Sequence, residues 1–156
     1  MIPEVKGKAL DDSEVVLPKP GSKPALILIV GFSRKGGDAC AVWNKKIAAA
    51  YHEDARVGYY NLPMLEEAPS LIRPIIVHGM KKGAAPGELG HLVPQYAKEN
   101  EWKKLVNYAA ADDAYLLVTD AAGKVAWQRH GIYSDGVFAE MKKAVEGLAG
   151  TGNWKK

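Results

Sequence analysis

The sequence predicts an α/β fold in which helices flank a central mixed β-sheet. The apolar run from Ala25 to Phe32 has the length and continuity of a strand that is buried on both faces. A helical segment separates this run from a second strand-like segment, residues 56–62, so the two strands should be parallel. Farther along, residues 115–119 and 124–129 have the pattern of a β-hairpin, and a final helix follows them.

Length and composition suit one globular domain spanning residues 1–156. The chain contains 47% hydrophobic and 25% charged residues, which are ordinary values for a folded domain. Its net charge of +3 is spread along the chain and no zinc-finger spacing is present, so we expect no nucleic-acid partner. The longest apolar run is far shorter than the roughly 20 residues that cross a bilayer, so we expect no transmembrane segment.

The chain has a single cysteine, Cys40, so no disulfide can form within it. This usage fits a reducing compartment, and it also fits an exported protein that uses no disulfides. We expect the bacterial periplasm, with a leader removed before Met1, and keep the cytoplasm as the alternative.

An N-terminal extension precedes the first buried strand, and a glycine-containing turn follows that strand. Residues 1–24 should form an extension in which Val15 to Leu17 lead into the core as an extended or hairpin segment. After the strand, Gly36 and Gly37 should supply a tight turn, and Asp38 should cap the next helix at its N-terminus.

Two helices are predicted from apolar residues at helical spacing. The first should extend over residues 39–52, with Trp43, Ile47 and Ala50 on its apolar face. The second should extend over residues 134–149. The residues of the second helix that have core spacing are Val137, Met141, Ala144, Val145 and Leu148.

Between the βαβ unit and the hairpin lies a variable insertion, residues 63–107. It should contain a helix over residues 64–83 that opens near Pro69 and is perturbed at Pro74. Residues 102–108 fit either a strand or a short helix. We expect this insertion to set partner specificity, and we expect the last residues, 150–156, to be a flexible tail.

The order βαβ, insertion, β-hairpin and final helix is that of the thioredoxin fold, and the sequence resembles the thioredoxin-like superfamily. The segment Leu117 to Val125 looks like the third-strand hairpin of the peroxiredoxin and membrane-anchored thioredoxin branches. Val5-Lys6-Gly7 followed by Val15 to Pro18 is similar to the same branch.

Within this superfamily, the sequence is most similar to the assembly factors of the F-type ATP synthase and their bacterial relatives, which have lost the cysteine pair. The resemblance rests on Phe32-Ser33, on Trp43 and on the segment Tyr115 to Asp120 with Trp127 and Gly131 after it. It implies a role in binding or assembly.

The resemblance also implies where a Cys-x-x-Cys pair would stand in this chain. Counting from Phe32, the two positions are Gly37 and Cys40, so the first sulfur is absent. The cis-proline that faces the sulfurs in thioredoxins is replaced at about that place by Ala114, which follows Asp113. Dithiol exchange needs two sulfurs within reach of each other, so one chain cannot perform it.

Cys40 has two interpretations. It is either a thiol buried under the helix or a reactive single thiol favoured by the helix N-terminus. In the second case Arg129 could support the thiolate, whereas Asp38 would oppose it. A reactive Cys40 would need an external thiol to resolve its oxidised form.

The sequence offers no pattern for a metal or cofactor, so we expect neither. No two of the four histidines are four residues apart, and no cysteine or carboxylate cluster completes a metal site. Phosphate-binding and dinucleotide-binding glycine patterns are absent, and Ser33 lacks the flanking glycines of a hydrolase nucleophile. The histidines are His52, His78, His91 and His130.

The leading functional hypothesis is a redox-inactive thioredoxin-fold protein that binds a protein partner as an assembly factor or chaperone, with no catalytic residue. The alternative is a single-cysteine thiol oxidoreductase or peroxidase that uses Cys40 and Arg129. A third hypothesis is a small-molecule binder at the same place. The residues expected at this binding corner are Gly36, Gly37, Asp38, Cys40, Asp113 and Ala114.

Overall fold

A computed structural model describes residues 1–19 and 23–150 of the chain. The central sheet has the strand order β4-β3-β5-β6. β3 pairs in parallel with β4 and antiparallel with β5, and β6 pairs antiparallel with β5. The predicted mixed sheet and its parallel βαβ unit are therefore confirmed. The strands are β3 (Ala25–Gly31), β4 (Val57–Pro63), β5 (Ala114–Thr119) and β6 (Val125–Gly131).

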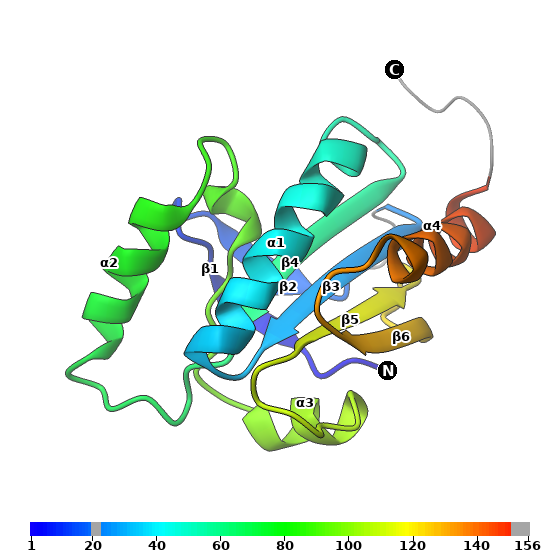
Figure 1. Ribbon diagram of the computed structural model, residues 1–156. Helices are drawn as coiled ribbons and strands as arrows, with labels where there is room; N and C mark the ends of the chain where they lie inside the picture. The colour runs from blue at the N-terminus through cyan, green and yellow to red at the C-terminus, as the bar shows by residue number, and fades with distance from the viewer. Residues whose placement is uncertain (20–22, 151–156) are drawn as a thin grey trace.

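Two layers cover the sheet (Figure 1). Helices α1 (Arg34–Tyr51) and α4 (Asp135–Ala149) cover one face. The other face is covered by α3 (Glu99–Leu105) and by a separate hairpin of β1 (Val5–Lys8) and β2 (Glu14–Leu17). Of the two forms expected for the N-terminal extension, extended or hairpin, the structure shows the hairpin. In the described part of the chain, no helix is both long enough and apolar enough to span a bilayer.

Strand β3 is apolar throughout because both of its faces are covered. All of its residues are buried. Leu26, Leu28 and Val30 contribute to the cluster beneath α3 and the hairpin, whereas Ile27 and Ile29 contribute to the cluster beneath α1 and α4. The side chains of a strand alternate between faces, so a strand at the centre of a three-layer fold needs apolar residues at every position.

Helix α1 begins earlier than the sequence predicts. Its N-cap is Ser33, whose hydroxyl accepts a hydrogen bond from the backbone N–H of Gly36. The prediction that Asp38 is the N-cap is wrong, and Gly36 and Gly37 lie in the first helical turn rather than in a loop. Serine caps helices as well as aspartate does, so the residue types alone do not choose between the two starts.

The apolar face of α1 also differs in one position from the prediction. Trp43 and Ile47 are buried as expected, but Ala50 is exposed and Tyr51 is buried in its place. The five additional residues at the start of α1 do not change which later residues lie at core spacing. Tyr51 follows Ile47 by four residues, the spacing that shares a helical face.

The insertion contains less helix than predicted. Residues 64–72 are not helical, and α2 (Arg73–Gly83) begins with Pro74 in its first turn. Proline is favoured there because the first N–H groups of a helix have no intrahelical partner. Pro74 therefore lies in the first turn of the helix and does not perturb its interior.

Of the two alternatives for residues 102–108, strand or short helix, the structure shows the helix: residues 102–105 are the end of α3.

After α2, the chain passes through the 3₁₀ helix η1 (Leu89–His91) and runs along the outer edge of β4. Val93 N–H donates to the carbonyl oxygen of Asn61 (2.9 Å), and Gln95 N–H donates to that of Pro63 (2.8 Å). This segment satisfies part of the polar edge of β4.

The C-terminal third of the fold matches the prediction. The side chain of Asp120 accepts hydrogen bonds from the N–H groups of Ala122 and Lys124 and so closes the β5–β6 turn. The hydroxyl of Ser134 caps α4, which buries Met141 and Val145. Of the predicted tail, residues 151–156 lie outside the described residues.

Candidate functional site

The candidate site is the corner where β3 ends, α1 begins and β5 starts. Ser33 joins two of these elements, because its hydroxyl donates to the carbonyl oxygen of Ala111 (2.7 Å) while accepting from Gly36 N–H (2.9 Å). Ala111 belongs to the segment 109–113 that leads into β5. One side chain therefore caps the helix and ties this segment to it.

Gly36 allows the segment before β5 to lie directly on the first turn of α1. A Cβ atom at Gly36 would lie 2.7 Å from the carbonyl oxygen of Ala111 and 3.2 Å from that of Asp113. Both distances are shorter than ordinary contacts, so any side chain at this position would force the segment 109–113 to move. Gly37 differs, because a Cβ atom there would meet nothing within 4 Å.

The segment 109–113 is held from its other side by Tyr115. The Tyr115 hydroxyl accepts hydrogen bonds from the N–H groups of Ala109 (2.8 Å) and Ala110 (2.9 Å). The Tyr115 ring lies against the ring of His130, at 5.1 Å between centroids. The Asp113 carboxylate in turn lies 2.8 Å from Nδ1 of His130. The backbone of this segment is thus fixed by hydrogen bonds at several points.

Cys40 does not face the corner as an accessible thiol. It lies in the second turn of α1, its side chain is 1% exposed, and a Cβ atom on Gly31 would lie 3.0 Å from its sulfur. Burial raises the pKa of the Cys40 thiol to about 12. A thiol with so high a pKa is protonated at neutral pH, and the thiolate is the nucleophilic form.

The two charged residues expected to act on Cys40 are Arg129 and Asp38. The guanidinium of Arg129 donates to the carboxylate of Glu140 on α4 at 2.7 Å, and both side chains are half-exposed. Asp38 is exposed on α1. The predicted support of a Cys40 thiolate by Arg129 therefore has no counterpart in these contacts.

The raised pKa of Cys40 makes stability depend on alkaline pH. The thiol has a pKa of 9.0 when unperturbed and about 12 when folded, so the stability that it supports is complete below pH 9 and is lost as pH rises towards 12. Between pH 8 and pH 10, the wild type should lose about 1 kcal/mol more of its free energy of unfolding than Cys40→Ala. Urea unfolding at both pH values measures this difference, and equal losses in the two proteins would contradict it.

The two positions expected for a dithiol, Gly37 and Cys40, lie within α1 and not at its N-cap. Because α1 begins at Arg34, the N–H of Gly37 already donates to the carbonyl oxygen of Ser33 (2.8 Å), so Gly37 and Cys40 lie beyond the helix start. The residues with capping geometry are Ser33 and Gly36, and neither has a sulfur. Ala114, at the expected cis-proline position, is fully buried in β5.

The six residues predicted for the binding corner divide by exposure. Gly36, Cys40 and Ala114 are buried, Asp113 is half-buried, and Gly37 and Asp38 are exposed. The structure brings Gly36 and Asp113 together across the corner. Within residues 1–19 and 23–150, no cluster of three metal-ligating side chains is found.

Sequence reasoning missed the exposed residues that surround this corner. Arg34 and Lys35 lie exposed on the first turn of α1. Ile132 is 76% exposed and directly follows Gly131, which pairs with Ala114 at the start of β5. Two features of the sequence could have indicated these residues. Arg34 and Lys35 form a basic pair directly after a strand, and Ile132 is an isolated apolar residue between a strand and the next helix cap.

No protein-family model and no curated protein sequence matches the chain. Solved structures do match. The pneumococcal exposed lipoprotein thioredoxin Etrx1 from Streptococcus pneumoniae gives a TM-score of 0.64 at 10% identity, over 90% of this chain and 99% of that one. A proposed thiol:disulfide interchange protein DsbE from Chlorobium tepidum gives 0.61 at 13% identity, over 92% and 94%.

A third similar structure is BsSco, a member of the Sco family of cytochrome c oxidase assembly proteins. It gives a TM-score of 0.54 at 10% identity, over 92% of each chain. At such low identities these likenesses show the fold alone. The predicted fold class is thereby confirmed: the chain has a thioredoxin-like fold.

Proposed function

We propose that this protein acts by binding another protein at the corner of α1, β5 and β6, without thiol chemistry. The burial of Cys40 carries the proposal. The chain has one cysteine, its side chain is 1% exposed, and its pKa is raised to about 12. Thiol oxidoreductases and peroxidases that use a cysteine need an accessible thiolate, so burial argues against the single-cysteine enzyme.

The corner has the features of a small docking surface. Arg34 and Lys35 supply positive charge, and Ile132 supplies an exposed apolar side chain. Between them, the segment 109–113 is fixed by Ser33 and Tyr115, so little conformational freedom would be lost on binding. Asp38 and Asp112 are also exposed at this corner, so the partner segment that fits the surface has an apolar anchor for Ile132 and an acidic group for Arg34 and Lys35.

We further propose that the partner is a subunit of a larger complex and that the protein works outside the cytoplasm, as one domain over residues 1–156. The likeness to F-type ATP synthase assembly factors at Phe32-Ser33 and Trp43 supports an assembly role. The description of BsSco as a member of an assembly family agrees with it. Etrx1, an exposed lipoprotein, supports the location, with the bacterial periplasm as our proposal.

Site-specific photo-crosslinking in cells tests the docking surface. A photoreactive residue at Ile132 should give an adduct with a partner, whereas the same residue at Lys124, in the turn at the other end of the β5–β6 hairpin, should not. The double variant Arg34→Glu/Lys35→Glu should reduce the adduct about tenfold or more. The matched charge change Lys142→Glu/Lys143→Glu on α4 should leave it unchanged. Equal adducts from both positions would refute the corner as the docking surface.

A turnover assay tests the enzymatic alternative directly. The protein is supplied with a hydroperoxide and an external thiol, and also with a disulfide substrate. We expect the wild type to turn over no faster than Cys40→Ser. If the wild type reduced either substrate catalytically and Cys40→Ser abolished the activity, binding would not be the primary function.

A further inference from the structure

Helix α2 leaves apolar side chains exposed beside the sheet. Figure 1 shows α2 standing apart from the helices that cover the two faces. None of its residues is buried. Leu71, just before it, is 90% exposed, Ile75 is 71% exposed and Ile72 is 42% exposed. These aliphatic side chains are neighbours in sequence and in space, so they form one exposed apolar patch.

Three exposed residues of α2 lie on one stripe of the helix. Ile75, His78 and Lys82 follow one another at intervals of three and four residues, the spacing that shares a helical face, and Leu71 lies in the turn just before the helix. All four are exposed. The stripe is apolar at its N-terminal end and basic at its C-terminal end, where Lys81 adds a further exposed cation.

The segment 68–87 contains basic residues and no Asp or Glu. Of the carboxylates that flank it, those of Glu66 and Glu88 are hydrogen-bonded to the body of the protein, and that of Glu67 is exposed near Lys103. The Glu66 carboxylate accepts from Glu99 N–H (2.9 Å), Glu67 lies 3.8 Å from the Lys103 ammonium, and Glu88 accepts from the Tyr59 hydroxyl (3.0 Å). The exposed surface of α2 is therefore cationic.

Arg73 fixes how α2 starts. Its guanidinium donates to the carbonyl oxygens of Ala68 and Glu66, each at 2.9 Å, and lies 5.1 Å from the centre of the Tyr96 ring. These contacts attach the first turn of α2 to the preceding loop and to the segment after η1. The apolar and basic stripe is thus presented by an anchored helix.

We propose that α2 docks on an anionic lipid surface, with Leu71, Ile72 and Ile75 inserted among the headgroups and Lys81 and Lys82 against the phosphates. The composition decides between a lipid and a protein surface. Protein interfaces are enriched in aromatic residues and Arg and depleted in Lys, and Leu is under-represented among their hot spots. Helices that lie on membranes combine aliphatic residues with lysines.

The charge and the apolar patch have separate tasks in this docking. The cations attract the protein to negative headgroups, and this attraction weakens as salt screens it. The aliphatic side chains then leave water when they insert. With so few of each, binding should be reversible. The surface is separate from the corner at Ile132, so this inference stands or falls independently of the proposed protein partner.

Co-sedimentation with lipid vesicles tests the proposal. The full chain should bind vesicles of phosphatidylcholine and phosphatidylglycerol at low salt. Its affinity for vesicles of phosphatidylcholine alone should be lower by a factor of about ten or more. Lys81→Gln/Lys82→Gln should weaken binding to the anionic vesicles by about 10- to 30-fold. Leu71→Ser/Ile75→Ser should weaken it by about tenfold.

Matched variants separate this helix from the overall positive charge. Lys142→Gln/Lys143→Gln removes the same charge from exposed positions on α4, and Val42→Ser removes an exposed apolar side chain from α1. Both should bind anionic vesicles as the wild type does, and circular dichroism should show that every variant is folded. No binding by the wild type, or equal weakening in the α2 and α4 lysine variants, would overturn the proposal. A crosslink from Ile75 to a protein without any vesicle binding would instead assign α2 to a protein partner.

Discussion

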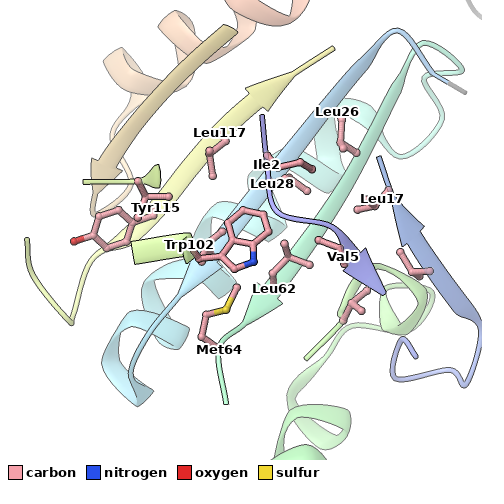
Figure 2. Packing of buried hydrophobic residues seen from close by; sticks show 14 of the residues in the cluster. Ile2, Val5, Leu17, Leu26, Leu28, Leu62, Met64, Trp102, Tyr115 and Leu117 are labelled. Atoms are coloured by element: carbon pink, nitrogen blue, oxygen red, sulfur yellow. The ribbon is translucent and has the colours of Figure 1, made fainter. Parts of the chain in front are cut away.

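Replacing Trp102 by alanine should lower the free energy of unfolding by about 3–5 kcal/mol. Trp102 projects from α3 onto the sheet and is fully buried. Figure 2 shows its indole over the strands, with Leu62 and Met64 beside it. Removing the indole would leave a large cavity where α3 and the N-terminal hairpin meet the sheet, and the neighbouring backbone cannot collapse fully into it.

Urea unfolding monitored by circular dichroism measures this loss. Trp127→Ala is the matched control, because Trp127 lies half-buried on β6 and should cost less. Trp102→Phe should also cost less than the alanine variant. Within the described residues the Trp102 Nε1 has no hydrogen-bond partner, so the ring is held by packing alone. Equal losses for Trp102→Ala and Trp127→Ala would contradict the central place of Trp102 in this layer.

Gly36→Ala should destabilise the protein by about 1–3 kcal/mol, whereas Gly37→Ala should stabilise it by about 0.5–1 kcal/mol. A Cβ atom at Gly36 would lie 2.7 Å from the carbonyl oxygen of Ala111, so the segment 109–113 must move and the hydrogen bond from Ser33 must lengthen. At Gly37 the added methyl group meets open space, and alanine favours the helix more than glycine does.

The two variants add the same methyl group at adjacent positions, so each is the control for the other. Unfolding by urea gives both signs in one experiment. If the two proteins had equal stability, the segment 109–113 would not lie against the first turn of α1. Crosslinking from Ile132 in the folded Gly36→Ala protein should also decrease, because the displaced segment forms part of the docking surface.

The parts of the fold that the sequence predicts well are those with strong local patterns. β3 is apolar at every position and α4 places Met141 and Val145 at core spacing, so both are recognisable without tertiary information. The start of α1 is different. Ser33 and Asp38 are both good caps, and the choice depends on the carbonyl oxygen of Ala111, which is far away in the sequence.

The candidate site also depends on contacts between residues that are far apart in the sequence. Cys40 attracts attention as the single cysteine, but its burial depends on the start of α1 and on the close approach of Gly31, which the sequence does not reveal. Gly36 looks like a turn residue until the segment 109–113 is placed over it. Ile132 follows a strand as an ordinary loop residue, and its exposure depends on the path between β6 and α4.

The rate of Cys40 alkylation as a function of pH, in the folded protein and in the urea-unfolded chain, tests the central claim most directly. We predict that the folded protein reacts about 1000-fold more slowly than the unfolded chain near neutral pH, because reaction requires opening of the buried site. The alkylation rate of the unfolded chain should rise with pH around the unperturbed thiol pKa of 9.0. Fast alkylation of the folded protein, with a midpoint well below that pKa, would show an activated thiol and would contradict a function based on binding alone.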